Sequence, residues 1–390
     1  MTIIDFSGGF LYNHKREEDG KNTRYGEKAR DVKVKRKTEL SVMNVFFCML
    51  VIFIHVSSAP VTGLTRPSWQ FAAVFTPWKL ASFVVYGFFF LGGIRFALHP
   101  PEDGAGGMLK YYLKRLLRIV IPYVLWVAAY VLWSMIFAGE KVTFSLYFDR
   151  LIHGTAAAHF YYVLTAIQFY LLAPLWKRLK KESAAVVLPL ALAVTLLFGH
   201  NLPEIVARLG YKGEILNDRI FTTYLFYWVA GIYAGMWYER FCEFLLRRVV
   251  WVSLFFIAAA VPEVWCNYLG QAYEKWFSAS FASSLHLLYI CAAILFFMTM
   301  ALFVGRLRFF RTRFFRTLDR CTFSVYLSHL MIMGTVNYLI GKFYPSATIL
   351  KAYLIRSAAT YAVTIAVCMI LCAAVQRLKE GKKGRIGRGT

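Results

Sequence analysis

The sequence contains few acidic residues and few charged residues of any kind. Only 21 of its 390 residues are Asp or Glu, and charged residues make up 17% of the chain. Hydrophobic residues make up 59%, and the mean hydropathy is +0.52. A soluble domain of this size could not bury so much apolar surface. The composition therefore argues against a soluble protein and predicts an all-α bundle that crosses a membrane several times.

Several familiar signatures are also missing. The chain has no GxxxxGK[ST] phosphate loop, no nucleotide-binding GxGxxG and no HExxH. Their absence argues against an ATP-driven pump and a zinc peptidase. The seven cysteines include no CxxC pair, and six of them lie in or beside apolar runs. We expect them to be small core residues, without disulfides and without a metal ion.

Long apolar runs are abundant. A helix needs about 20 mainly apolar residues to cross the hydrocarbon core of a bilayer. Runs of this kind, bounded by charged residues, Pro and Gly, predict ten membrane spans. We expect them near residues 42–60, 78–98, 116–138, 158–176, 184–200, 219–238, 249–263, 284–304, 321–340 and 352–376.

The positive charge follows the predicted spans. The net charge is +24, and 33 of the 45 Lys and Arg residues fall on one side if both termini are cytoplasmic. This asymmetry is the positive-inside pattern of a multi-pass plasma-membrane protein. Nucleic acid is a poor partner, because the charges lie in short loops beside the spans. The basic face remains available to anionic lipid or a phosphorylated cofactor.

The predicted organisation is one membrane domain with two basic tails. The first 37 residues are polar and contain ten Lys or Arg, which is longer than the basic region of a signal peptide. We expect residues 1–38 to form a disordered cytoplasmic tail and residues 39–377 to form the membrane domain. Residues 378–390 would form a second basic cytoplasmic tail.

One imidazole lies where lipid-embedded residues are expected. His55 belongs to the segment VIFIHVSSAP in the first predicted span, eleven residues after Asn44. At 100° per residue the two residues share nearly the same helix face, roughly 16 Å apart. An ionisable group in a membrane marks a functional site unless a neighbouring helix satisfies it, and both interpretations remain open for a lone histidine. A neutral imidazole near the outer side can act as a general base on a hydroxyl.

Two further histidines are predicted inside the bundle. His159 opens the fourth predicted span, in HFYYVLTAIQFYLLAPLW, near the level of His55. His329 lies near the middle of the ninth, in LDRCTFSVYLSHLMIM, with Tyr326 three residues earlier on the same face. A histidine at this depth with a tyrosine beside it is expected to face the bundle interior and not the lipid.

Arginines mark the cytoplasmic mouth. Arg115 and Arg118 lie three residues apart in YYLKRLLRIVIPYVLW, where the third predicted span begins. Two guanidinium groups on one helix face can bind phosphate bidentately, although an isolated pair is more often a positive-inside anchor. Arg95 lies near the inner end of the second predicted span and can extend to the interface.

These motifs, in this order, resemble acyltransferase family 3, the multispan membrane acyltransferases that modify hydroxyls of envelope glycans. The resemblance rests on His55 in the first span and on the segments FVVYGFFFLGGI, LKRLLRIVIPY, HFYYVLTAIQFYLLAP and SVYLSH. The family's first-span arginine is replaced here by Asn44, and Arg95 is the candidate to take its place.

The resemblance implies an enzyme that moves an acyl group, expected to be acetyl, from acyl-CoA to a hydroxyl of an envelope glycan or exopolysaccharide. The donor phosphates would lie at the cytoplasmic mouth and the acceptor at the outer side, with His55 as base and other groups supporting the oxyanion. The expected catalytic residues are His55, His159, Tyr326 and His329, and the expected donor-binding residues are Arg95, Arg115, Arg118 and Asn44.

Two other classes of protein remain open. Buried histidines and tyrosines in ten spans would also suit a proton-coupled transporter or a lipid-linked glycan flippase. Such transporters usually show paired broken helices in two related halves, and the sequence shows no such symmetry. The loss of the family arginine at Asn44 would also suit a catalytically silent membrane partner in an envelope assembly.

Overall fold

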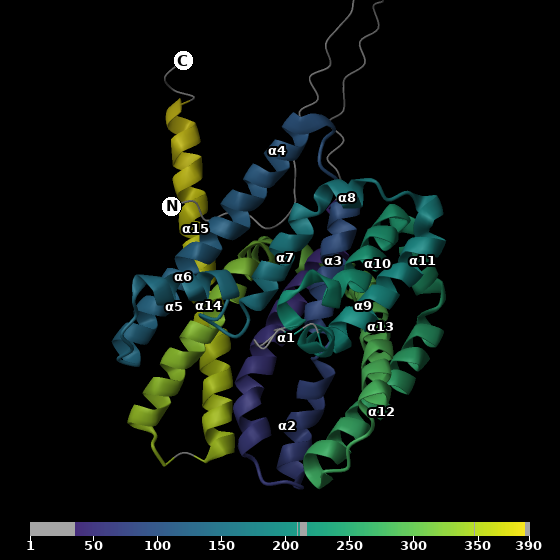
Figure 1. The fold of residues 1–390 in the computed structure, drawn as a ribbon. Helices are drawn as coiled ribbons and strands as arrows, with labels where there is room; N and C mark the ends of the chain where they lie inside the picture. The colour runs from purple at the N-terminus through teal and green to yellow at the C-terminus, as the bar shows by residue number, and fades with distance from the viewer. Residues whose placement is uncertain (1–35, 209, 211–216, 347, 387–390) are drawn as a thin grey trace, which may run out of the picture.

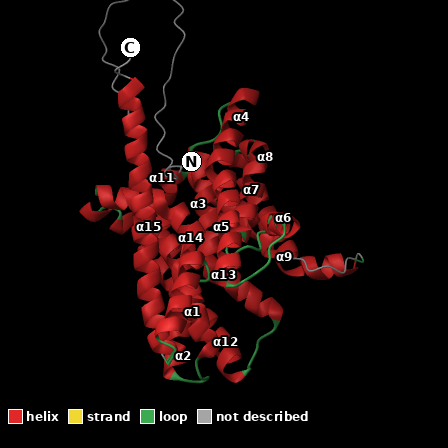
Figure 2. Ribbon diagram, turned by 90° about the vertical axis from the view of Figure 1, so that its left-hand side faces the viewer, coloured by secondary structure: helices red, strands yellow, loops and turns green. Residues whose placement is uncertain are grey.

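The computed structural model describes residues 36–208, 210, 217–346 and 348–386, and every regular element in these ranges is helical. The helices pack into one bundle, shown in Figure 1, and Figure 2 shows short loops between them. The predicted all-α class is therefore confirmed for the described residues. The predicted amino-terminal tail lies almost entirely outside them. All seven cysteines are free thiols, as expected.

The bundle consists of fifteen α-helices within the described ranges, together with short π-helical and 3₁₀ turns. The π-helical turn is Leu116–Val120, between α4 and α5. The helices are α1 (Thr38–Gly63), α2 (Trp69–Leu80), α3 (Val84–Leu98), α4 (Gly104–Arg115), α5 (Ile121–Phe137), α6 (Phe144–His153), α7 (Tyr161–Leu171), α8 (Ala173–Lys177), α9 (Ala184–Arg208), α10 (Leu225–Met236), α11 (Tyr238–Arg247), α12 (Val249–Tyr273), α13 (Ala279–Val304), α14 (Arg313–Phe343) and α15 (Ile349–Ile386).

Eight helical segments of the described chain are long and apolar enough to cross a membrane. The predicted count of ten is therefore not confirmed, because the fourth and sixth predicted spans contain only shorter helices. Pro174 begins α8 directly after α7 and so interrupts the fourth span. The eight segments are Thr38–Gly63, Trp69–Leu98, Gly104–Phe137, Lys181–Phe198, Val249–Tyr273, Ser280–Val304, Arg313–Phe343 and Ile349–Ala374.

The sixth predicted span begins as two 3₁₀ turns, Asn217–Arg219 and Phe221–Tyr224, and continues as the twelve-residue α10. Side chains of neighbouring helices bond the backbone there, and Thr195 Oγ1 accepts a hydrogen bond from the amide of Phe226 at 3.0 Å. Irregular backbone is tolerated at membrane depth where protein partners satisfy it.

The turns of the bundle gather at its two ends. The loops that join α1 to α2, α12 to α13 and α14 to α15 lie at the bottom of Figure 1. Helices α4 and α8, with the basic segments around them, lie toward the opposite end. This separation agrees with the predicted clustering of basic loops on one face. That this face is cytoplasmic stays a prediction.

Helices α3 and α10 approach each other closely through glycine. A Cβ atom at Gly93 would lie 2.1 Å from the carbonyl oxygen of Trp228, and one at Gly231 would lie 2.1 Å from that of Phe90. Small residues allow such backbone contact between membrane helices. The FFFLGG segment that supported the family resemblance therefore has a packing role on α3.

A buried carboxylate on α12 joins this helix to α2 and α13. Glu263 of α12 is 1% exposed, and its Oε1 atom lies 2.9 Å from Lys79 Nζ of α2 and 2.8 Å from His286 Nδ1 of α13. Buried ionic groups in membranes require such partners. The triad fixes α2 against α12 and α13 on the side of the bundle away from α14.

Candidate active site

Three histidines from distant segments meet inside the bundle. His55 lies on α1, His159 in the turn before α7 and His329 on α14. Their ring centroids are 5.2 Å apart for His55 and His329, 4.6 Å for His159 and His329, and 6.2 Å for His55 and His159. His159 and His329 are buried, whereas His55 is half-buried. We call these three residues the histidine cluster.

Tyr326 completes the predicted catalytic group. It lies one turn before His329 on α14, and its ring centroid is 4.9 Å from that of His159. Its hydroxyl donates a hydrogen bond to the carbonyl oxygen of His159. The structure therefore brings all four predicted catalytic residues together, but the hydroxyl proton of Tyr326 is held by the backbone.

A backbone hydrogen bond fixes the tautomer of His329. Its Nδ1 atom lies 2.7 Å from the carbonyl oxygen of Tyr326, and a carbonyl can only accept. In the neutral imidazole Nδ1 therefore carries the proton and Nε2 carries a lone pair. Nε2 is buried and has no hydrogen-bond partner within the described chain. At Nε2 the neutral His329 side chain can accept a hydrogen bond or a proton, but it has no proton on this atom to donate.

His159 has the complementary property. Both of its ring nitrogens are buried, and neither makes a well-formed hydrogen bond among the described residues, although the backbone of Leu327 lies close enough to interact with the imidazole. Buried polar atoms without partners are rare in folded proteins and call for a ligand or water. One nitrogen of a neutral imidazole carries a proton, so His159 can donate. The histidine cluster thus offers a donor and an acceptor around one small volume.

Tyr130 supports this turn of α14 from α5. Its hydroxyl donates to the carbonyl oxygen of Leu327 at 3.1 Å and accepts from the amide of Met331 at 3.0 Å. These two bonds bracket His329 along the helix. Tyr130 was not predicted, because nothing in the sequence distinguishes it from the other tyrosines of the apolar spans.

The three imidazoles do not form a metal centre. In the ranges that the structure describes, no group of three or more His, Cys, Asp or Glu residues is arranged to hold a metal ion.

A second polar group lies on the same two helices. Asn44 precedes His55 by eleven residues on α1, and Asp319 precedes His329 by ten on α14, so each lies roughly 15 Å from its histidine. Asn44 Nδ2 donates to Asp319 Oδ1 at 2.9 Å and to Thr322 Oγ1 at 2.8 Å. Asp319 is 2% exposed. These contacts fix α1 and α14 in register roughly 15 Å from the histidine cluster.

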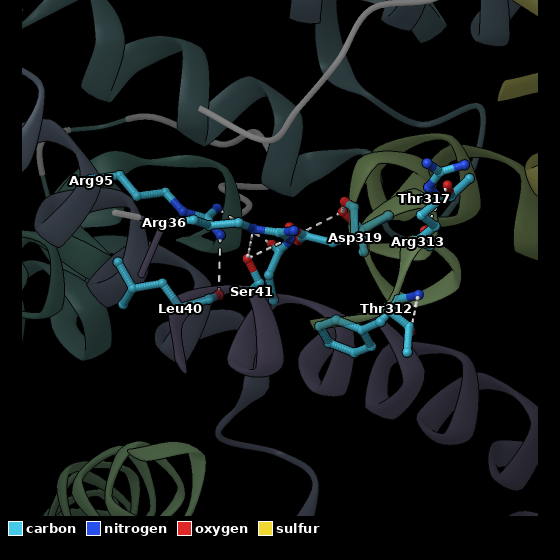
Figure 3. A network of polar contacts seen from close by, with 11 residues as sticks. Arg36, Leu40, Ser41, Arg95, Thr312, Arg313, Thr317 and Asp319 are labelled. Atoms are coloured by element: carbon cyan, nitrogen blue, oxygen red, sulfur yellow. Dashed lines mark hydrogen bonds and ion pairs between the residues drawn. The ribbon is translucent and has the colours of Figure 1, made fainter. Parts of the chain in front are cut away.

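Two arginines reach this second group, as Figure 3 shows. Arg36 forms an ion pair with Asp319 and donates to Ser41 Oγ at 2.8 Å. Arg95 of α3 extends to within 3.4 Å of the side-chain oxygen of Asn44. The predicted donor-binding residues Asn44 and Arg95 therefore lie together. Arg36 and Asp319 were missed, because charges at the start of a span are usually interfacial.

His99 directly follows α3 and lies beside Arg95. Burial and the adjacent Arg95 guanidinium lower the pKa of the His99 imidazole below its ordinary value.

Arg115 lies apart from these residues, where α4 meets the π-helical turn. Its guanidinium lies over the ring of Tyr170 at 4.3 Å and near that of Tyr111 at 5.0 Å. It lines a cavity of about 260 Å³ whose other walls are largely apolar, among them Leu116 and Ile167.

Arg118 falls inside the π-helical turn Leu116–Val120. A π-helical turn is wider than an α-helical one, so residues three apart share a face less closely than the sequence spacing predicts. Arg118 is not among the residues that line the cavity at Arg115. Binding of one phosphate by both guanidinium groups stays a prediction, with Arg115 placed against Tyr170.

Comparison with known families gives one match. Residues 38–373 match the family described as Acyltransferase domain, which is acyltransferase family 3. The matched range runs from α1 through most of α15 and includes every predicted site residue. No curated protein and no solved structure gives a significant match.

Proposed function

Because the chain belongs to acyltransferase family 3 and is a multi-pass membrane acyltransferase, we propose that it moves an acetyl group from acetyl-CoA to a hydroxyl of an envelope glycan or exopolysaccharide. The donor, the acyl group and the acceptor are the proposed parts. The observation that carries them is the histidine cluster, in which buried imidazole nitrogens with no partner in the described chain lie beside the half-buried His55.

His55 is the proposed general base. Its partial exposure leaves it accessible to an acceptor hydroxyl, whereas His159 and His329 are buried. Its imidazole takes the hydroxyl proton as the acceptor oxygen attacks the thioester carbonyl carbon. The carbon–sulfur bond then breaks, and the leaving CoA thiolate takes the proton from the imidazolium. The products are the O-acyl ester and CoA with a free thiol.

Hydrogen bonds within the cluster favour His159 as the donor to the oxyanion. Tyr326 already donates its hydroxyl proton to a carbonyl oxygen, and His329 donates its Nδ1 proton to another. His159 has a ring N–H with no partner in the described chain. A preorganised donor of this kind stabilises an acyl-transfer transition state by roughly 3 kcal/mol.

His329 is proposed as a positioning residue for His55. Its unprotonated Nε2 atom has no partner in the described chain and can accept a hydrogen bond from the His55 ring. The centroids of the two rings are 5.2 Å apart. Acceptance of this bond would orient His55 and stabilise the imidazolium that forms on it. The third member of a serine-protease triad acts on its histidine in the same way.

The donor would enter from the basic end. Arg115 and Arg118 would hold the CoA phosphates, and Arg95 would supply positive charge beside Asn44, where the family has its arginine. The polar group at Asn44 lies roughly 15 Å from the histidine cluster along α1 and α14. The extended pantetheine arm would span this distance and deliver the thioester to His55.

Acetyl transfer can be tested with the purified full-length protein in proteoliposomes. Radiolabelled acetyl-CoA is added with and without envelope glycan, and free CoA thiol and labelled glycan are measured. We expect release of CoA in proportion to glycan acetylation. Transport of glycan without consumption of acetyl-CoA, or no labelling of any glycan, would contradict the proposal.

A further inference from the structure

Arg219 lies in a backbone segment that α7 holds in place. The 3₁₀ turn Asn217–Arg219 replaces the start of the sixth predicted span. Thr165 Oγ1 donates to the carbonyl oxygen of Asp218 at 3.2 Å, and Gln168 Nε2 donates to that of Arg219 at 2.7 Å. Gln168 Oε1 also accepts the amide of Phe221 at 3.0 Å. The position of this turn therefore does not depend on the Arg219 side chain.

The guanidinium of Arg219 lacks a partner of opposite charge in the described chain. Its Nε and Nη1 atoms are buried and have no hydrogen-bond partner there. The neighbouring carboxylate of Asp218 interacts with Tyr161 and Tyr224, whereas Arg219 interacts with Tyr123. A buried arginine with no partner of opposite charge in the described chain is costly and marks a candidate functional position.

Aromatic rings connect this arginine to the histidine cluster. Tyr123, which lies within electrostatic range of Arg219, packs against Phe160 with ring centroids 5.3 Å apart. Phe160 in turn packs against His159, with centroids 4.6 Å apart. Arg219 is therefore separated from the proposed oxyanion donor by two aromatic side chains.

We propose that Arg219 binds an anionic group, a carboxylate or a phosphate, on the acceptor and thereby holds the acceptor hydroxyl near His55. This inference rests on the proposed function and narrows its acceptor to an acidic saccharide. The guanidinium presents a planar fork of N–H donors that matches both anions, and burial strengthens the attraction. A phospholipid headgroup carries the same phosphate chemistry and is the alternative source of the anion.

The binding test uses three probes, namely glucuronate, glucose 6-phosphate and glucose. Their affinities for the purified full-length protein in neutral detergent are measured by calorimetry. We expect at least one anionic probe to bind at least tenfold more tightly than glucose. Arg219→Gln should abolish this preference, and Arg219→Lys should retain part of it. Equal affinity for all three probes, absence of binding, or an unchanged preference in Arg219→Gln would overturn the inference.

Arg150 of α6 provides the matched control, because its guanidinium is ion-paired with Glu140. Arg150→Gln should keep the wild-type preference, and size-exclusion chromatography checks that each variant is folded. Nanodiscs with and without phosphatidylglycerol separate the two sources of the anion. If Arg219→Gln loses only retention of phosphatidylglycerol and binds the saccharides normally, a headgroup occupies the site and the acceptor inference is wrong.

Failure of the inference can be told apart from failure of the proposed function. CoA release from acetyl-CoA is measured in the same preparations. Arg219-dependent binding of an acidic saccharide without any acetyl transfer would support the anion site and contradict the proposed acetyltransferase activity. Acetyl transfer that is equally fast in wild type and Arg219→Gln with every acceptor would support the acetyltransferase activity and contradict the anion site.

Discussion

The Nδ1 atom of His329 lies 2.7 Å from the carbonyl oxygen of Tyr326, one turn earlier on the same helix. Because the carbonyl must accept, the bond leaves a lone pair on Nε2 inside the histidine cluster. His329 can thereby accept a hydrogen bond from its neighbour His55, whose ring centroid is 5.2 Å away. The division of roles among the three imidazoles follows from this contact.

Replacement of His329 by Ala should lower kcat by about 100-fold, because His55 loses the acceptor that orients it. The KM for acetyl-CoA should change little. Added imidazole should restore part of the activity by occupying the space that the ring leaves. His153→Ala, which removes an exposed histidine of α6, is the control and should be fully active. Full activity of His329→Ala without imidazole would show that His55 needs no partner.

Truncation of Arg115 should weaken binding of the donor nucleotide without disturbing the chemistry. A lost charge-assisted contact to phosphate corresponds to roughly a tenfold increase in the KM for acetyl-CoA. Acetyl-pantetheine lacks the nucleotide phosphates, so its KM should be the same for wild type and Arg115→Gln. Arg118→Gln should behave in the same way. An equal increase in KM for both donors would show that these arginines do not bind the nucleotide phosphates and act only through the structure of the protein.

Loss of the Asp319 carboxylate should destabilise the bundle. It is buried between Arg36 and Asn44, and removal of one partner of a buried ion pair costs about 3 kcal/mol. Thermal unfolding in detergent should show a lower Tm for Asp319→Ala. Asp103→Ala removes an exposed ion pair with Lys177 and should leave the Tm unchanged. Equal Tm values for the two variants would mean that the Asp319 contacts add nothing to stability.

A side chain at Gly93 should force α3 and α10 apart. Its Cβ atom would lie 2.1 Å from the carbonyl oxygen of Trp228, a backbone atom that cannot move alone. We expect Gly93→Ala to lose at least about 2 kcal/mol of stability, measured by thermal unfolding. Gly341→Ala is the control, because no atom lies within 4 Å of its added Cβ. A wild-type Tm for Gly93→Ala would show that the helices can separate without cost.

Hydropathy predicted the membrane spans that are single long helices. It did not predict where a span is irregular, because side chains of neighbouring helices there bond backbone groups that a regular helix would pair. Every long apolar run was found, because length and apolar composition are local properties. The sixth predicted span does not begin as a regular helix, because Gln168 and Thr195 bond the backbone of its 3₁₀ turns. Such turns inside a bundle leave no signature in the apolar pattern.

The candidate site also has parts that the sequence predicts and parts that it does not. Helical periodicity placed Asn44 and His55 on one face of α1, because both belong to one helix. That His159 and His329 meet His55 depends on contacts between distant segments, which one sequence does not reveal. Glu263 and His286 gave no signal for the same reason, since the pairing of Glu263 with Lys79 and His286 exists only in the folded bundle.

The proposed role of His55 is tested most directly by acetyl transfer in His55→Ala. Purified wild type and variant are reconstituted at equal density and checked for equal Tm. Labelled acetyl-CoA and envelope glycan are then supplied, and acetylated glycan is counted. The account predicts that the variant forms ester at least about 100-fold more slowly than wild type, as expected when a general base is lost. Ester formation at the wild-type rate would contradict it.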